Sequence, residues 1–229
     1  MVWSFKFYGI TIGVLIIMIE ADKNIARFVK HVKTIAKKHG VTIKISQSKN
    51  VRGPGETSLC AGYFYDDGKH RTIVVAAGKK TNHDWVAVLA HEYSHMMQWI
   101  EGDKTYKDTS MRNGEDSYYH LSMLESGKAK YSKRLRQIYT RKTIMCELNC
   151  ERRTVKTIQE FNLPINVKQY KKEAAAILYK YLLLCKTGRW YGSPTEKNKT
   201  VLSKIKPSLK GRFIKLPAEI EKTIKLLSI

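Results

Sequence analysis

Two histidines four residues apart are the part of this sequence best suited to chemistry. His91 and His95 enclose Glu92 in the pattern His-Glu-Tyr-Ser-His. On a helix, residues i and i+4 lie one turn apart on one face, so two imidazoles there can hold one Zn²⁺. The glutamate after the first histidine is placed to act on water beside the metal. The pattern therefore predicts His91 and His95 as zinc ligands and Glu92 as the general base of a hydrolysis.

The residues around this motif favour a helix over 81–100. Thr81 followed by Asp84 resembles a capping box, and no proline or glycine interrupts the segment up to Ile100. Apolar residues recur at helical spacing: Trp85, Val88, Leu89, Met96 and Trp99. The alternative interpretation is a surface helix with two unrelated histidines, because this short pattern also arises by chance.

A third ligand can come from a second predicted helix, residues 132–161, which ends before Pro164. It contains Glu147-Leu148-Asn149-Cys150-Glu151, in which the two glutamates lie one turn apart on one face. A carboxylate is a common zinc ligand. Alternatively, both glutamates are exposed and pair with nearby basic residues.

The sequence HEYSH followed by ELNCE resembles the gluzincin branch of zinc metallopeptidases, including small members associated with phages and mobile elements that act on repressors. The resemblance implies an α+β, zincin-like fold, mostly helical with a small antiparallel sheet. It implies a zinc metalloendopeptidase whose ligands are His91, His95 and Glu147 and whose base is Glu92. The expected substrate is a protein or peptide.

The sequence departs from the family pattern at one acidic position. Glu151 stands where the family has an aspartate that orients a ligand histidine, and it is longer by one methylene. Either Glu147 or Glu151 therefore remains a candidate for the third ligand. Cys150 stands at the family's small-residue position.

Three further residues are candidates for stabilising a developing oxyanion. Residues 101–120 are polar and mixed in charge, and are expected to form a loop or lid. Tyr118, Tyr119 and His120 lie in it, and a tyrosine or histidine beside the metal can donate a hydrogen bond to an oxyanion.

Before the motif, the pattern predicts a helix and three strands. Residues 22–39 form an amphipathic helix, residues 41–46 alternate like a strand, and residues 62–65 and 71–76 flank an Asp-Gly turn typical of a hairpin. A strand just before such a helix can form the rim of a cleft to which an extended peptide adds.

We expect three parts in the chain. Residues 1–21 form an apolar N-terminal segment, 22–165 the zincin-like metallopeptidase domain, and 166–229 a basic helical extension packed on it. The apolar run 7–19 is short for a membrane span and lacks a signal-peptide cleavage pattern, and Met18 is an alternative start to Met1. Membrane anchoring by this segment stays open.

The four cysteines show no C-x-x-C pair and do not suggest a disulfide framework. A reducing, cytoplasmic compartment is therefore expected. Cys146 and Cys150 lie one turn apart on the second predicted helix, as metal ligands or as small buried residues.

The charge is strongly positive, with a formal net value of +22. It is uneven: residues 81–150 carry 10 basic and 9 acidic side chains, whereas residues 151–229 carry 18 basic and 6 acidic ones. Such an excess favours non-specific binding to nucleic acid, or is only a solvated lysine-rich surface. The alternative function is thus a basic nucleic-acid-binding protein with a structural or inactive zinc site, or a protease recruited to DNA-bound proteins.

Overall fold

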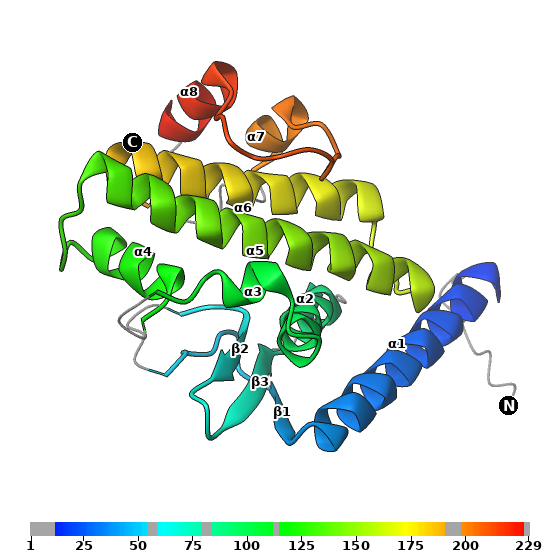
Figure 1. The fold of residues 1–229 in the computed structure, drawn as a ribbon. Helices are drawn as coiled ribbons and strands as arrows, with labels where there is room; N and C mark the ends of the chain where they lie inside the picture. Colours follow the sequence, from blue (N-terminus) through cyan, green and yellow to red (C-terminus); the bar gives the residue numbers. More distant parts are fainter. Residues whose placement is uncertain (1–11, 55–58, 79–83, 112–114, 191–197, 227–229) are drawn as a thin grey trace, which may run out of the picture.

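The computed structural model describes residues 12–54, 59–78, 84–111, 115–190 and 198–226 (Figure 1). Helices dominate it and a small sheet lies at one end. The elements in chain order are α1 (Ile12–Lys38), β1 (Val41–Ser46), β2 (Gly62–Asp66), β3 (Arg71–Ala76), α2 (Asp84–Ile100), α3 (Lys104–Lys107), α4 (Ser117–Glu125), α5 (Lys133–Glu160), α6 (Val167–Thr187), α7 (Lys199–Lys204) and α8 (Ala218–Leu226).

The sheet has the strand order β1-β3-β2, and it corrects the expectation of an antiparallel sheet. β2 and β3 form the predicted antiparallel hairpin, but β1 pairs with β3 in parallel, with Val41 opposite Arg71. The alternating pattern of a strand sets which side chains are buried and says nothing about its direction. β2 begins at the edge of the sheet where β1 ends and runs back, so the hairpin starts β3 beside the start of β1.

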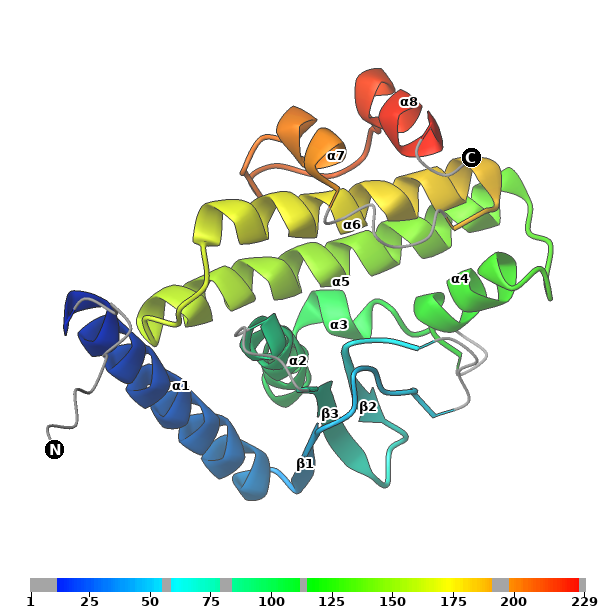
Figure 2. The ribbon, with the colours of Figure 1, turned by 180° about the vertical axis from the view of Figure 1, so that it is seen from behind.

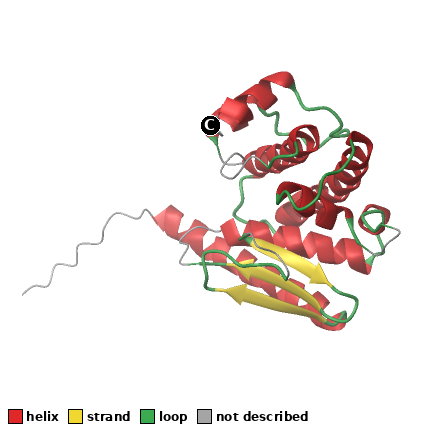
Figure 3. Ribbon diagram, turned by 90° about the vertical axis from the view of Figure 1, so that its left-hand side faces the viewer, coloured by secondary structure: helices red, strands yellow, loops and turns green. Residues whose placement is uncertain are grey.

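The sheet and the N-terminal helices share one core, which we call the N-terminal core. Ile73 and Val75 of β3 are fully buried and point to one face of the sheet. They pack with apolar residues of α1 and α2 (Figure 3). The buried members are Ile25, Phe28, Val32, Ala36, Val41, Ile73, Val75, Val86, Leu89, Ala90, Tyr93, Met96, Ile158, Phe161 and Leu163.

The C-terminal helices build a second core on the far side of α5, which we call the C-terminal core. α5 and α6 lie side by side, with α7 and α8 beyond α6 (Figures 1 and 2). Its buried members are Ile144, Leu148, Val155, Ala174, Ala175, Ala176, Leu178, Leu183, Val201, Leu202, Ile205, Leu209, Phe213, Ile220 and Ile224. α6 therefore packs against α5, and α7 and α8 join the same core.

Local signals explain where the two longest C-terminal helices begin and end. The Ser132 hydroxyl caps α5 by accepting from the Leu135 N–H, and the Asn166 amide oxygen caps α6 by accepting from Gln169. Gly188 ends α6 at a φ of 71°, which glycine adopts without steric cost.

The predicted helices are present, with some changes at their ends. α1 begins earlier than the predicted residue 22, and α2 begins at Asp84, so that Thr81 lies outside the described residues. The segment 101–120 is not a plain loop: Asp103 caps the short α3 and Asp116 caps α4. Residues 1–11 also lie outside the described part, and within that part no helix is both long and apolar enough to cross a membrane.

Candidate metal centre

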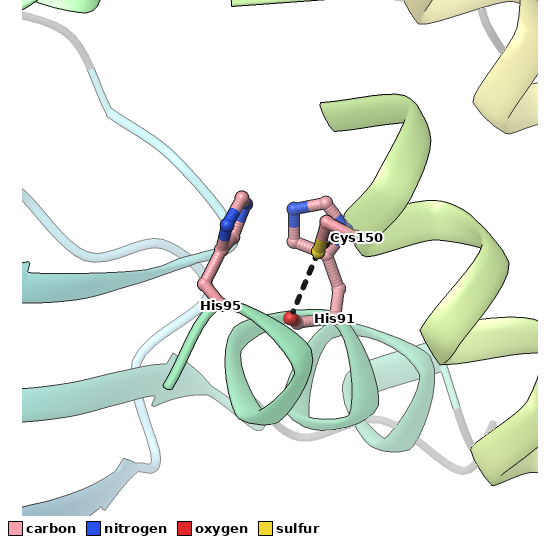
Figure 4. A group of neighbouring side chains, drawn as sticks. All are labelled: His91, His95 and Cys150. Carbon is pink, nitrogen blue, oxygen red and sulfur yellow. Dashed lines mark hydrogen bonds between the residues drawn. The ribbon is translucent and has the colours of Figure 1, made fainter. Parts of the chain in front are cut away.

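The two histidines of the motif lie together on α2 (Figure 4). Their imidazole centroids are 4.7 Å apart and their planes are inclined by 85°. Leu89, two residues before His91, and Met96, directly after His95, are fully buried in the N-terminal core. This packing fixes the rotation of α2, so both imidazoles are presented toward α5.

Glu147 of α5 faces both imidazoles. Its Oε2 lies 3.6 Å from His91 Nε2 and its Oε1 lies 3.7 Å from His95 Nε2. The Tyr118 hydroxyl donates to the same Oε1 at 2.8 Å. Burial would raise the pKa of Glu147, but His95, His91 and this hydroxyl outweigh it and lower the pKa to about 2. Glu147 is therefore a buried carboxylate that stays ionised between two imidazoles.

Glu151 contacts the other edge of His91. Its Oε1 lies 3.3 Å from His91 Nδ1, and its Oε2 accepts a short hydrogen bond from the Tyr170 hydroxyl of α6. Burial, and then the Glu151 charge, raise the pKa of Tyr170 well above its usual range, so this hydroxyl keeps its proton. The two glutamates thus take different positions, with Glu147 between the histidines and Glu151 behind one of them.

His95 is supported by an uncharged side chain. Its Nδ1 lies 2.9 Å from Gln98 Oε1. The Gln98 amide nitrogen donates to the Cys146 carbonyl and to Asn149 Oδ1, both at 3.0 Å. Because the amide N–H₂ faces two acceptors, its oxygen must face His95, which then donates from Nδ1, so Nε2 is the nitrogen that faces Glu147 with a proton or a metal ion. Gln98 is fully buried.

The support of His95 continues to the surface through Arg153. The Arg153 Nε donates to Asn149 Oδ1 at 2.7 Å, and the guanidinium forms ion pairs with Glu101 at 2.7 Å and Asp103 at 3.0 Å. A chain of polar contacts therefore runs from the ring of His95 to the loop that leads into α3.

Glu92 is buried next to the edge strand of the sheet. It is 7% exposed, and its carboxylate accepts a hydrogen bond from the backbone N–H of Phe64 in β2. Burial raises the pKa of Glu92, an effect that His91, His95 and this hydrogen bond partly oppose. A carboxylate with a raised pKa suits a group that must first accept and then release a proton.

Cys150 completes the group from α5. Its Sγ donates to the His91 carbonyl at 3.4 Å and lies 3.6 Å from His91 Nδ1 (Figure 4). One nitrogen of each histidine and this sulfur lie within 4.8 Å of one another. A second such group is formed by His91, Glu147 and Glu151. Among the described residues, these are the two groups of three whose donor atoms all lie this close together.

Charge within this cluster favours protonated histidines when no cation is bound. Burial lowers the pKa of His91 and of His95, but the Cys150 sulfur and the neighbouring glutamates outweigh it, so both pKa values lie well above the usual range. A divalent cation would replace these protons.

Of the three oxyanion candidates, Tyr118 is the one with a contact to the cluster, and its hydroxyl is engaged by Glu147. Tyr119 is 46% exposed. His120 is buried elsewhere: its ring contacts Glu115 at 3.2 Å and the Tyr131 hydroxyl at 3.0 Å.

Sequence reasoning missed Gln98, Tyr170 and the Phe64 N–H. Gln98 follows His95 by three residues on the motif helix, so helical spacing was a signal for it. Tyr170 and Phe64 reach the site through tertiary packing, and no local pattern indicates them. Comparison with models of known protein families, with curated proteins and with solved structures found no match.

Proposed function

We propose that this protein is a zinc-dependent metallopeptidase with a zincin-like catalytic domain. One observation carries the proposal: Glu147 from a second helix faces the Nε2 atoms of His91 and His95 at 3.6 and 3.7 Å, with Glu92 buried beside them. Two histidines and one glutamate are a donor set of catalytic zinc sites.

The spacing of the donor atoms fits a metal ion. Ligands of a tetrahedral zinc at bond lengths of about 2.0–2.3 Å stand about 3.5 Å apart. The separations between Glu147 oxygens and the two Nε2 atoms are close to this value. Mixed imidazole and carboxylate donors also suit zinc better than magnesium or calcium, which prefer oxygen ligands alone.

The two glutamates of α5 have separate roles in this proposal. Glu147 is the third ligand because it faces the nitrogens that Gln98 and Glu151 leave free. Glu151 orients His91 by accepting from Nδ1, as carboxylates behind ligand histidines do. Tyr118 holds Glu147 in place, and Tyr170 holds Glu151.

Glu92 is the general base. Zinc, when bound, would polarise the scissile carbonyl and make water a better nucleophile. Glu92 would take the proton of the attacking water and deliver it to the leaving amine. Its burial excludes bulk water from the carboxylate, and the Phe64 N–H fixes one of its orientations.

The position of β2 supports a peptide substrate. β2 is an edge strand of the sheet, and its Phe64 lies against Glu92. An extended peptide that added to this edge would run past the proposed base.

The experiment is metal analysis and peptidase assay on the same preparations. We expect wild type to hold about one zinc per chain. Glu92→Gln should keep the zinc and lose cleavage of a peptide library, because the base is not a ligand. His91→Ala with His95→Ala should lose the zinc. Stoichiometric zinc in this double variant, or full activity in Glu92→Gln, would contradict the proposal.

A second candidate function is polyanion binding by the C-terminal helices, which we propose as separate from hydrolysis. Its support is the excess of basic residues in 151–229 and a pocket of about 480 Å³ that includes Arg152, Lys171 and Lys210. Arg152 is held toward this pocket by hydrogen bonds to the carbonyls of Leu209 and Gly211. Such a cluster suits phosphate groups of DNA or RNA.

A further inference from the structure

Cys150 lies inside the proposed metal centre and not merely next to it. Its sulfur and one nitrogen from each of His91 and His95 lie within 4.8 Å of one another. The side chain is fully buried, and the sulfur lies 3.6 Å from His91 Nδ1, the nitrogen that also faces Glu151, on the same side of α2 as the two imidazoles (Figure 4).

The helical register explains why Cys150 reaches the centre and the other buried cysteine of α5 does not. Cys150 follows Glu147 by three residues, so both side chains leave α5 on the face toward α2. Cys146 instead directs its sulfur to Gln98 Oε1, at 3.7 Å. The two cysteines are therefore a matched pair, one within the donor group and one behind His95.

We propose that Cys150 is a fourth metal donor that closes the proposed centre, so that His91, His95, Glu147 and Cys150 can surround the ion together. This inference rests on the metal site of the proposed function. Zinc with four protein ligands is typical of closed structural sites, whereas catalytic sites keep one position open. Binding of the Cys150 sulfur to the metal would therefore give a closed site, and its release would give an open one.

Two arrangements of Cys150 correspond to the two states. In one, the thiol keeps its proton and donates it to the His91 carbonyl, as observed at 3.4 Å. In the other, the sulfur loses this proton to water as the sulfur–metal bond forms, and the thiolate, a strong zinc ligand, occupies the fourth position. Rotation about the single χ1 bond of cysteine moves the sulfur between the two. The closed state excludes water and substrate from the metal, so peptide cleavage by wild type comes from the chains in the open state.

The test is the optical spectrum of the full chain loaded with Co²⁺ in place of zinc. A thiolate bound to Co²⁺ gives an intense charge-transfer band in the near ultraviolet, whereas imidazole and carboxylate ligands do not. We expect this band in wild type, its loss in Cys150→Ser with the cobalt still bound, and its retention in the matched control Cys146→Ser. Hydrolysis by zinc-loaded Cys150→Ser should then exceed that of wild type.

A second measurement does not depend on a variant that folds. X-ray absorption at the zinc edge of wild type should show one sulfur neighbour at about 2.3 Å. Stoichiometric cobalt without the charge-transfer band, or a zinc shell without sulfur, would overturn the role of Cys150 and leave the proposed function intact. Absence of any bound metal in wild type would overturn both.

Discussion

The two sides of α5 are built in opposite ways. The side toward α2 and α4 buries charged and polar groups, among them Glu147, Glu151, Thr143 and Thr154. The side toward α6, α7 and α8 contributes Ile144, Leu148 and Val155 to the apolar C-terminal core. One helix therefore carries the candidate site on one face and a hydrophobic interface on the other.

Each of these four polar groups has a partner. Thr143 Oγ1 lies 2.8 Å from the Ser117 hydroxyl, and Thr154 donates to the Ser94 hydroxyl at 3.0 Å. Burying a polar group costs free energy unless it is hydrogen-bonded, so the first pair fixes α4 against α5 and the second fixes α2 against α5. Burial of apolar side chains on the C-terminal side therefore stabilises the fold, whereas hydrogen bonds between polar side chains on the site side fix the geometry of the centre.

The largest expected effect separates the two glutamates on the site side. Glu147→Ala should remove stoichiometric zinc, because the third ligand is lost. Glu151→Ala should weaken zinc binding by about 10–100-fold, as changes behind a ligand histidine do. Zinc affinity measured by competition with a chelator checks both. If Glu151→Ala loses the zinc while Glu147→Ala keeps it, the two roles are reversed.

The next effect concerns the C-terminal side of α5. Leu178 of α6 is fully buried in the C-terminal core. Leu178→Ala should lower the free energy of unfolding by about 2–5 kcal/mol, because it removes buried apolar atoms and leaves a cavity. Denaturant unfolding measures this loss, and zinc per folded chain should stay unchanged. A loss of zinc from the folded variant would show that the two sides are not independent.

One hydrogen bond links α6, on the C-terminal side of α5, to the candidate metal centre, so the two sides are not fully independent. The Tyr170 hydroxyl of α6 donates to Glu151 on the site side. The start of α6 thus holds Glu151 in position, a contact that the sequence did not indicate. The predicted parts 22–165 and 166–229 therefore meet at the candidate metal centre.

The site was predictable from sequence where its geometry is local. His91 and His95 are four residues apart on one helix, and Glu147 and Glu151 are four apart on another, so helical spacing alone placed each pair on one face. The choice between Glu147 and Glu151 needed the distance between two helices, which no periodicity contains. The parallel pairing of β1 was missed for a related reason, since strand direction depends on a non-local connection.

A moderate effect on zinc affinity is expected from a change at Gln98, the uncharged side chain that contacts His95. Gln98→Leu keeps the volume of the side chain and removes the acceptor of His95 Nδ1. Zinc affinity should fall by about 10-fold or more, because the imidazole loses its fixed tautomer. Chelator competition measures the change. Arg153→Met, further along the same contacts, is the graded control and should cost less; an equal loss in both variants would show a general destabilisation.

The smallest effect on the centre is expected from the basic surface. Lys199, Lys204, Lys206 and Lys210 are exposed on the C-terminal side. Changing all four to glutamate lowers the formal net charge from +22 to +14. We expect zinc content and peptide cleavage to remain at the wild-type level, because these lysines lie outside the polar contacts of α2 and α5. Retention on duplex DNA should fall.

A matched control distinguishes a binding surface from net charge. Lys23, Lys30, Lys33 and Lys37 are exposed on α1, and their change to glutamate alters the charge by the same amount. Phosphate contacts release counterions, so the slope of log affinity against log salt should be reduced more by the C-terminal variant than by the α1 variant. If both variants bind DNA as weakly as wild type at about 0.15 M salt, where the screening length is about 8 Å, the lysines form only a solvated surface. The C-terminal side of α5 would then contribute only to the stability of the fold.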